Sequence, residues 1–323
     1  MPKRKVTVGR FLWETWLPAI KTTVRTSTFL SYQSHLRNHI CPYIGEKRLD
    51  RIDGSALNGL YATLLERGRQ NGTPLSAATV RRVHAVLHRA FRDAMRWGLI
   101  ARNPCAGADP PKLRAGRQTQ FSTWSADELK RFLDFVQDDK LHPLWLLLAT
   151  TGMRRGEALG LRWCDLDLGH GEAAIRQTVV SHHYVIAMSE PKTARGRRVV
   201  ALDDHSVAAL AIYKKEQSPE HKDELVFCYR TKTPLNPIDI SKRFIKLSQG
   251  AGLRRIRLHD LRHTHATLAL QAGIHPKIVS ERLGHSTISL TLDIYSHAIP
   301  HLQKEAAAEI ATLVLGRFEA SEG

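Results

Sequence analysis

The sequence is poor in cysteine and lacks long apolar runs. It has only four cysteines, and no two of them form a Cys-x-x-Cys pair: Cys41, Cys105, Cys164 and Cys228. This pattern suggests neither a disulfide framework nor a cysteine zinc site, so a reducing, intracellular compartment fits. No stretch approaches the roughly 18 uninterrupted apolar residues of a membrane span, and the basic N-terminus lacks the apolar run of a signal peptide. We therefore expect a soluble, cytoplasmic protein.

Acidic residues are scarce in the first third of the chain. Residues 1–120 contain 21 Lys and Arg against 7 Asp and Glu, a balance of +14, whereas residues 121–323 contain 27 against 24, a balance of +3. The whole chain has a formal net charge of +17. Such an excess predicts a polyanionic partner, with nucleic acid favoured over an acidic membrane surface. At 323 residues the chain is also long enough for two domains.

Apolar residues recur with helical spacing throughout residues 8–104. We predict a first helix over residues 8–17 that ends before Pro18, a second over 27–40, and a third over 53–67 with Asp53 as N-cap. A fourth begins at Ser76 and places five apolar residues on one stripe: Val80, Val83, Leu87, Phe91 and Ala94. This region is therefore expected to be a helical domain.

The fourth helix also has a basic stripe, on which no acidic residue is expected. Its members are Arg82, Arg89, Arg92 and Arg96. The four arginines could simply be solvated side chains on an exposed helix face, but a stripe of positive charge alone favours contact with phosphates. We predict that these side chains bind DNA.

The region after this domain is rich in proline, glycine and basic residues and has no apolar period. We predict a helical DNA-binding domain over residues 1–104, a linker over 105–122, and a second domain over 123–323. Because the linker is positively charged, we expect it to lie along a phosphate backbone, with Arg114 and Arg117 as the candidate contacts.

The second domain is predicted to be helical with a small antiparallel β-sheet, so the fold class is mainly α, α+β. A capping box of Ser125 and Glu128 opens it, and a buried helix over residues 143–151 follows. Strand-like patterns cover residues 173–180, 184–187 and 198–202. Helices are expected near Asp204, Pro237, His259, Pro276 and Ser286, with a final amphipathic helix over residues 300–318.

Several polar residues of this domain suit phosphate chemistry. His259 and Arg262 are three residues apart, so both can reach one anion from a single helix face. Arg154 follows a glycine turn between two apolar helices, where a rigid, partly buried guanidinium needs an acid or an anion as partner. Together with His285 and Tyr295, these residues are what phosphoryl transfer to a protein hydroxyl requires.

In this order and spacing, the set resembles the tyrosine recombinase (phage integrase) family of site-specific DNA recombinases. The resemblance covers residues 123–297, and residues 8–104 look like the family's SAM-like core-binding domain. The matching segments are Thr151-Gly152-Met153-Arg154-Arg155-Gly156-Glu157, Lys192, His259-Asp260-Leu261-Arg262-His263, Leu283-Gly284-His285 and Tyr295. A match to any one of these segments, or boxes, is weak support, whereas matches to all five in the family's order are strong support.

The resemblance implies a mechanism. Arg154 and Arg262 would place guanidinium groups on the non-bridging phosphate oxygens, and His259 and His285 would add hydrogen bonds. His259 is the better candidate to take the proton of Tyr295, which would attack phosphorus and hold the DNA as a 3′-phosphotyrosine. Lys192 would protonate the leaving 5′ oxygen. Glu157 and Asp260 would orient the cations, whereas His263 and His265 are expected to be structural.

The resemblance also implies partners. These are double-stranded DNA at specific recombination sites, a homotetramer on that DNA, and possible accessory DNA-bending or directionality proteins. We expect no cofactor, neither metal nor ATP, and a nucleoid-associated protein of prokaryotic or phage origin. The final helix, around residues 310–318, is the candidate contact between neighbouring protomers. Arg195, Arg197 and Arg198 share the turn of Lys192, and DNA-backbone contact would explain all of them.

Four alternatives stay open at this stage. The chain could be a two-domain, Xer-like recombinase rather than an integrase, since no arm-binding domain precedes residue 8 or that domain was trimmed. A type IB topoisomerase would use the same chemistry. A DNA-binding regulator could have the fold without strand cleavage. Finally, His259 and His263 have the spacing of a zinc hydrolase, with His285 as third ligand, although a neighbouring arginine suits a metal poorly.

Overall fold

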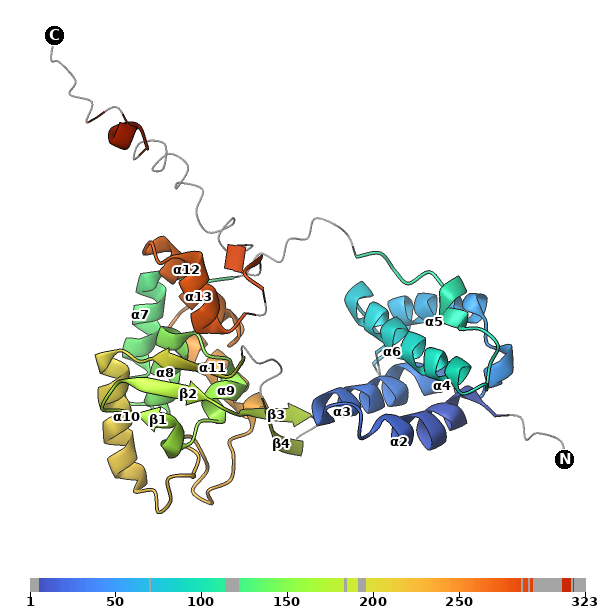
Figure 1. Cartoon of the computed structure of the whole chain (residues 1–323), viewed down its shortest axis with the longest axis horizontal. Helices are drawn as coiled ribbons and strands as arrows, with labels where there is room; N and C mark the ends of the chain where they lie inside the picture. The colour runs from blue at the N-terminus through green and yellow to red at the C-terminus, as the bar shows by residue number, and fades with distance from the viewer. Residues whose placement is uncertain are drawn as a thin grey trace, which may run out of the picture. The chain divides into compact units, whose positions relative to one another are not determined.

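The computed structural model describes residues 6–69, 71–113, 122–182, 185–190, 196–285, 287–289, 291–292, 310–314 and 316. The chain forms two compact units, residues 1–119 and 120–323 (Figure 1). Among the described residues, no helix is both long and apolar enough to cross a lipid bilayer.

Unit 1 is helical throughout. Its elements are α1 (Val8–Arg10), a π-helical turn (Phe11–Trp16), α2 (Leu17–Ile20), α3 (Thr26–His35), a second π-helical turn (Leu36–Ile40), α4 (Cys41–Ile44), a 3₁₀ turn (Leu49–Arg51), α5 (Gly54–Arg67), α6 (Ala77–Arg96) and a 3₁₀ turn (Pro104–Gly107). The expected cap Asp53 is confirmed, because it accepts a hydrogen bond from the backbone N of Ala56. Ser76, where the fourth helix was predicted to begin, is the N-cap of α6 and accepts a hydrogen bond from the backbone N of Thr79.

Two helices of unit 1 continue through a proline, so the predicted ends at residues 17 and 40 are wrong. In each case a π-helical turn comes just before the proline. The backbone N of Leu17 donates to the carbonyl of Leu12, and that of Cys41 donates to the carbonyl of Leu36, both five residues back. A proline ring clashes with the carbonyl four residues before it, and the wider π turn relieves that clash.

The core of unit 1 lies between α6 and the N-terminal helices. The predicted apolar stripe of α6 is buried in full. Asp93, on the same helix, is buried as well and accepts a hydrogen bond from Nε1 of Trp16 at 2.9 Å. This bond gives a polar group in the core its partner.

The first residues of the predicted linker pack against unit 1. Cys105 is buried in the core of this unit, and the backbone N of Asp109 donates to Oδ1 of Asn58 at 2.7 Å. Residues 114–121 lie outside the described part of the chain.

Unit 2 contains helices and two small sheets. The helices are α7 (Ala126–Phe135), α8 (His142–Thr151), α9 (Arg155–Leu159), α10 (Asp204–Gln217), α11 (Pro237–Gly250), α12 (Asp260–Gln271) and α13 (Pro276–Leu283), with a 3₁₀ turn at Trp163–Asp165. The strands are β1 (Leu166–Asp167), β2 (Glu172–Ile175), β3 (Thr178–His182), β4 (Val185–Ser189) and β5 (Arg198–Ala201). The predicted capping box of Ser125 and Glu128 is confirmed.

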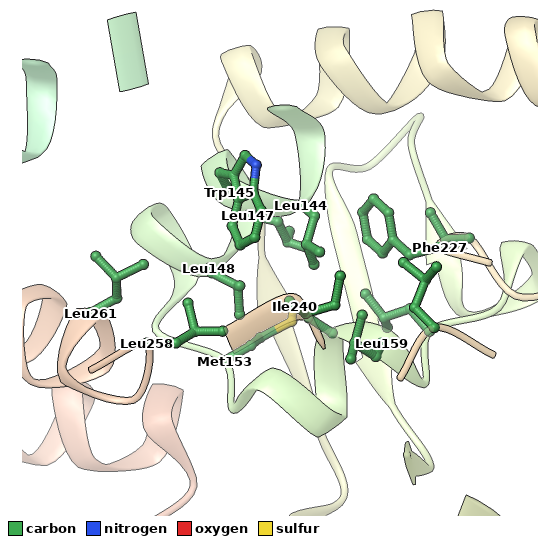
Figure 2. Packing of buried hydrophobic residues seen from close by; sticks show 14 of the residues in the cluster. Leu144, Trp145, Leu147, Leu148, Met153, Leu159, Phe227, Ile240, Leu258 and Leu261 are labelled. Carbon is green, nitrogen blue, oxygen red and sulfur yellow. The ribbon is translucent and has the colours of Figure 1, made fainter. Parts of the chain in front are cut away.

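Helix α8 forms the centre of the core of unit 2. Figure 2 shows its side chains Leu144, Trp145, Leu147 and Leu148 among buried residues from other elements of the same unit. Trp145 and Phe244, from α11, also join an aromatic cluster with Phe132 and Trp124. Truncating one such aromatic to alanine costs about 3–5 kcal/mol, so this cluster fixes the frame on which the polar residues sit.

The strands pair differently from the single sheet that the sequence predicted. The long strand expected over residues 173–180 breaks at Arg176 and Gln177, and Nε2 of Gln177 donates to the carbonyl of Gly160 at 2.9 Å. As a result, β2 lies between β1 and β5 in one antiparallel sheet, whereas β3 pairs with β4 in another. Strand β5 therefore runs beside β2 and belongs to a different sheet from β4.

Candidate active site

The first arginine box is shaped by a left-handed glycine. Helix α8 ends at Gly152 with φ of +64°, a conformation that side chains disfavour. The turn presents Arg154 just before α9. The backbone N of Arg154 donates to Oε2 of Glu157 at 2.9 Å, and its Nη1 donates to Oε1 at 2.7 Å. The acid partner that the sequence requires for Arg154 is therefore Glu157.

Arg262 is held from α12 and is almost completely buried, with 4% of its surface exposed. Its Nη1 donates to the carbonyl of Gly152 at 2.9 Å, and its Nη2 donates to the carbonyl of Leu283 at 2.7 Å. Burial and the neighbouring charge of Arg154 lower the pKa of Arg262 to about 9. The guanidinium is therefore still a cation at neutral pH, and it is held by carbonyl dipoles.

Three arginines meet at the C-terminus of α13. The carbonyl of Arg282 accepts from Nε of Arg198 at 2.7 Å, that of Leu283 accepts from Arg262, and that of Gly284 accepts from Nη2 of Arg154 at 3.1 Å. The last carbonyls of a helix have no intrahelical donors and carry its negative end, so cations are stabilised there. Gly284, with φ of +66°, closes the helix in the left-handed conformation.

Glu157 is the anion at the centre of this group. Nη1 and Nη2 of Arg198 donate to its two oxygens at 3.3 and 3.0 Å, and Arg154 donates as well. Burial disfavours the charge of Glu157, but the bonds and charges of Arg198 and Arg154 outweigh it and lower the pKa of Glu157. The carboxylate is therefore ionised and fixes the relative positions of two guanidinium groups.

Three histidines surround the arginines. The rings of His259 and His263 meet edge to face at 5.2 Å. Burial and then the charge of Arg262 lower the pKa of both His259 and His285, the latter to about 3. Burial and the proximity of His259 lower the pKa of His263 to about 4. All three rings are therefore mainly neutral at pH 7 in the DNA-free protein.

His285 is oriented by a residue that the sequence analysis did not single out. Its Nδ1 lies 2.8 Å from Oγ1 of Thr291, which is completely buried. Because Nδ1 is engaged, Nε2 is the ring nitrogen of His285 that remains for a ligand. Beside it lies a cavity of about 500 Å³, whose lining includes Arg197, Arg198, Lys277 and His285.

His265 supports the glycine turn. Its Nδ1 lies 3.1 Å from the carbonyl of Ala149, and its ring packs so closely on Gly152 that a Cβ there would lie 2.8 Å from its Cδ2. Within the described residues its buried Nε2 has no hydrogen-bond partner. These contacts agree with the structural part that the sequence predicted for this histidine.

The other predicted site residues are placed as follows. Asp260 binds Arg257, with Nη2 of Arg257 2.7 Å from Oδ1, and makes no ion pair with Arg154 or Arg262. Arg197 pairs with Glu190 on the surface at 2.9 Å. The remaining predicted residues lie outside the described part of the chain: Arg114, Arg117, Lys192, Arg195 and Tyr295.

The four arginines of the basic stripe of α6 differ in their contacts. Nη1 of Arg89 donates to the hydroxyl of Tyr32 at 3.0 Å, and Arg96 pairs with Asp93 at 3.3 Å. An acidic residue therefore contacts this stripe, contrary to the expectation from the sequence. Arg82 and Arg92 are exposed and have no acidic partner in the part of the chain that the structure describes.

Sequence reasoning missed two residues that organise the site. Arg198 was grouped with Arg195 and Arg197 in one basic run, and only its burial separates it from them. Thr291 precedes Tyr295 by four residues, but a lone threonine carries no signal. The role of Arg198 depends on partners that are distant in sequence, and nothing in the sequence shows that the Thr291 hydroxyl will reach His285, six residues away.

Family models match most of the chain. Residues 123–301 match the model described as the phage integrase family, and residues 10–64 match that of the phage integrase N-terminal SAM-like domain. The first match begins at the predicted start of the second domain and includes each of the boxes discussed above.

Curated relatives cover nearly the whole chain. A tyrosine recombinase XerC-like protein of Caldanaerobacter subterraneus subsp. tengcongensis is 31% identical over 94% of this chain and 82% of its own length. The ICEBs1 integrase of Bacillus subtilis is 26% identical over 86% and 76%, respectively.

Solved structures share the fold. A Tn1549 transposon integrase in complex with circular intermediate DNA has a TM-score of 0.74 and 23% identity, covering 96% of this chain and all of that one. A lambda integrase tetramer bound to a Holliday junction has a TM-score of 0.67 and 19% identity, covering 90% and 78%. At these identities the likeness concerns the fold alone.

Proposed function

Since the chain belongs to the phage integrase family of tyrosine recombinases, we propose that it integrates and excises a mobile element at specific DNA sites. The observation that carries this proposal is the convergence of Arg154 and Arg262 on consecutive carbonyls at the end of α13, with neutral histidines around them. Fixed cations beside neutral proton acceptors are what cleavage of a phosphodiester requires.

The two arginines stabilise the charge that develops on the phosphate. A phosphodiester carries one negative charge, and its pentacovalent transition state carries more. Each terminal nitrogen of Arg262 uses one N–H on a carbonyl and retains another for a phosphate oxygen. The site is partly closed to water, so these donors are worth more than at an open surface.

The proton transfers are assigned to other residues. Tyr295 attacks phosphorus through its hydroxyl oxygen and loses its proton to neutral His259. The bond from phosphorus to the 5′ oxygen breaks, and Lys192 protonates that oxygen as it leaves. The product is a 3′-phosphotyrosine and a free 5′ hydroxyl. The reverse attack by a 5′ hydroxyl rejoins the strand, so neither ATP nor a metal is needed.

Recombination of two duplexes exchanges four strands, so we infer a tetramer on DNA. The solved lambda integrase is a tetramer on a Holliday junction. In this chain, residues 310–314 are helical, and Ile310, Leu313 and Val314 are 62%, 88% and 71% exposed. An apolar helical segment without cover supports its assignment as the contact between neighbouring protomers.

Covalent trapping tests this function. A nicked substrate releases a short 3′ fragment after cleavage, so rejoining is prevented and the protein stays on the DNA. The unmodified chain is expected to form an adduct that survives denaturation, and Tyr295→Phe is expected to bind the same DNA without forming it. A protein that only binds DNA would give no adduct. A zinc hydrolase would lose activity with EDTA, whereas adduct formation should be indifferent to it.

A resolvase role is the second candidate, because the XerC-like relative matches 94% of the chain. The two roles differ in the arrangement of sites that supports recombination. Recombination assays on two plasmids, one with two identical sites and one with a pair of unlike sites, distinguish the two roles. Efficient recombination of identical sites alone would favour the resolvase.

A further inference from the structure

Arg198 joins two parts of the candidate active site. It is the first residue of β5 and lies six positions after Lys192 in the sequence. Its guanidinium contacts both oxygens of Glu157 from the first arginine box and the carbonyl of Arg282 just before the third box. Its Nη1 also lies 3.3 Å from the carbonyl of Gly196. Four of its five N–H groups therefore donate to protein acceptors.

This arrangement does not suit a DNA contact. The Arg198 side chain is 8% exposed and that of Glu157 is 4% exposed, whereas Arg197 beside it is 61% exposed. The acceptors around Arg198 leave it only one N–H, on Nη2, so its guanidinium cannot place a two-donor fork on a phosphate, whereas Arg262 keeps one N–H on each terminal nitrogen. Its effect on the reaction must pass through the groups that it holds.

We propose that Arg198 is a positioning residue, which sets Arg154 through Glu157 and ties β5 to the end of α13. The inference rests on the proposed recombinase function. Glu157 alone could rotate about its side-chain torsions, but the bidentate contact with Arg198 fixes both oxygens. One of these oxygens accepts a hydrogen bond from Nη1 of Arg154. This bond fixes the direction in which the other N–H groups of Arg154 point.

A positioning role for Arg198 predicts that the effect of its loss depends on the charge of the scissile group. If it acts by aiming Arg154, its loss should matter most when the scissile group carries a negative charge. A methylphosphonate replaces one non-bridging oxygen by a methyl group and is uncharged, so it depends less on a well-aimed guanidinium. The bond that forms and the bond that breaks are the same in both substrates.

The test compares Arg198→Lys with the unmodified chain on nicked phosphodiester and methylphosphonate substrates. Lysine keeps the charge but has one donor centre, so it cannot join Glu157 to the carbonyl of Arg282. We expect the rate of adduct formation to fall about 10–100-fold on the phosphodiester and less than about threefold on the methylphosphonate. DNA affinity should be unchanged.

Arg162→Lys is the matched control. Arg162 binds the two oxygens of Asp165, which is also buried, at 2.9 and 3.0 Å, and within the described residues its ion pairs are with Asp165 and Asp223, which lie outside the boxes. This variant should lose thermal stability to a similar degree and cleave both substrates at the normal rate. If Arg198→Lys fails to fold, the double variant Arg198→Met with Glu157→Gln removes both buried charges together and should show the same difference between substrates.

Two results would overturn the inference. An equal loss on both substrates would mean that Arg198 only stabilises the fold, and no loss on either would mean that it has no part in the reaction. If the unmodified chain forms no adduct at all, the proposed function itself fails, which is a different outcome from a normal adduct with an unaffected Arg198 variant.

Discussion

Arg154 and Arg262 donate to consecutive carbonyl oxygens, that of Gly284 at 3.1 Å and that of Leu283 at 2.7 Å. The two guanidinium groups come from residues 108 positions apart, yet one helix end holds both. The same segment continues into His285 and towards Tyr295. A displacement of the end of α13 would therefore move both cations and the histidine together, and we expect cleavage to be sensitive to substitutions at this helix end.

Substitution of either arginine should separate catalysis from binding. Arg154→Lys keeps the charge and removes the planar fork, so we expect adduct formation to slow about 100-fold or more. DNA affinity should change little, because other basic residues supply most of it. Single-turnover cleavage and gel-shift titration measure the two effects. A parallel loss of affinity would contradict a role in the transition state.

Thr291 offers a finer test of the histidine geometry. Thr291→Val keeps the shape but removes the hydroxyl that lies 2.8 Å from Nδ1 of His285, whereas Thr291→Ser keeps the hydroxyl. One lost hydrogen bond is worth about 1 kcal/mol, so the valine variant should cleave roughly fivefold more slowly and the serine variant should cleave nearly normally. Equal rates for both variants would show that the bond does not orient His285.

Acid should destabilise unit 2. Folding lowers the pKa of His263 and His265 to about 4 and that of His285 to about 3, below the ordinary value of 6.5. Between those values and 6.5 the unfolded chain binds more protons, so stability falls as pH falls through this window. Each histidine adds a slope of up to about 1.4 kcal/mol per pH unit.

His265→Phe should flatten this dependence, because phenylalanine fits a ring-shaped site and cannot bind a proton. Urea unfolding at pH 7 and pH 5 measures it. The variant is expected to lose less stability than the unmodified chain between the two pH values. An unchanged difference would mean that His265 does not titrate in this range.

The arginines of α6 should contribute unequally to DNA binding. Arg82 and Arg92 are exposed without an acidic partner in the described residues, whereas Arg96 pairs with Asp93. Arg82→Ala and Arg92→Ala should each reduce the slope of log K against log salt by about 1, and Arg96→Ala by less. Equal slopes for all three variants would contradict the expected difference between Arg96 and the other two arginines.

The sequence predicted those features that depend on local patterns. The caps at Asp53 and Ser125 follow from short-range hydrogen bonds, and the glycine turn before Arg154 follows from a residue that tolerates positive φ. Each of these features can be seen within a few residues of sequence. The order of the boxes along the chain then identified the family.

Features that depend on distant partners could not be predicted. Nothing near Arg198 in the sequence shows that Glu157 will bury it. Arg257 and Arg262 are both within three residues of Asp260, and the choice between them depends on where the surrounding fold places each guanidinium. The pairing of β5 with β2 depends on where the chain returns after the hairpin. Likewise, the helices continue through Pro18 and Pro42 because π turns relieve the clash, and no local propensity signals such turns.

The most direct measurement identifies the amino acid that holds the DNA. The trapped adduct is digested with protease and nuclease, and the peptide that carries the nucleotide is sequenced by mass spectrometry. We predict a single modified peptide, with a 3′-phosphate linked to Tyr295. Linkage to any other of the seven tyrosines, or to a serine, would contradict the account.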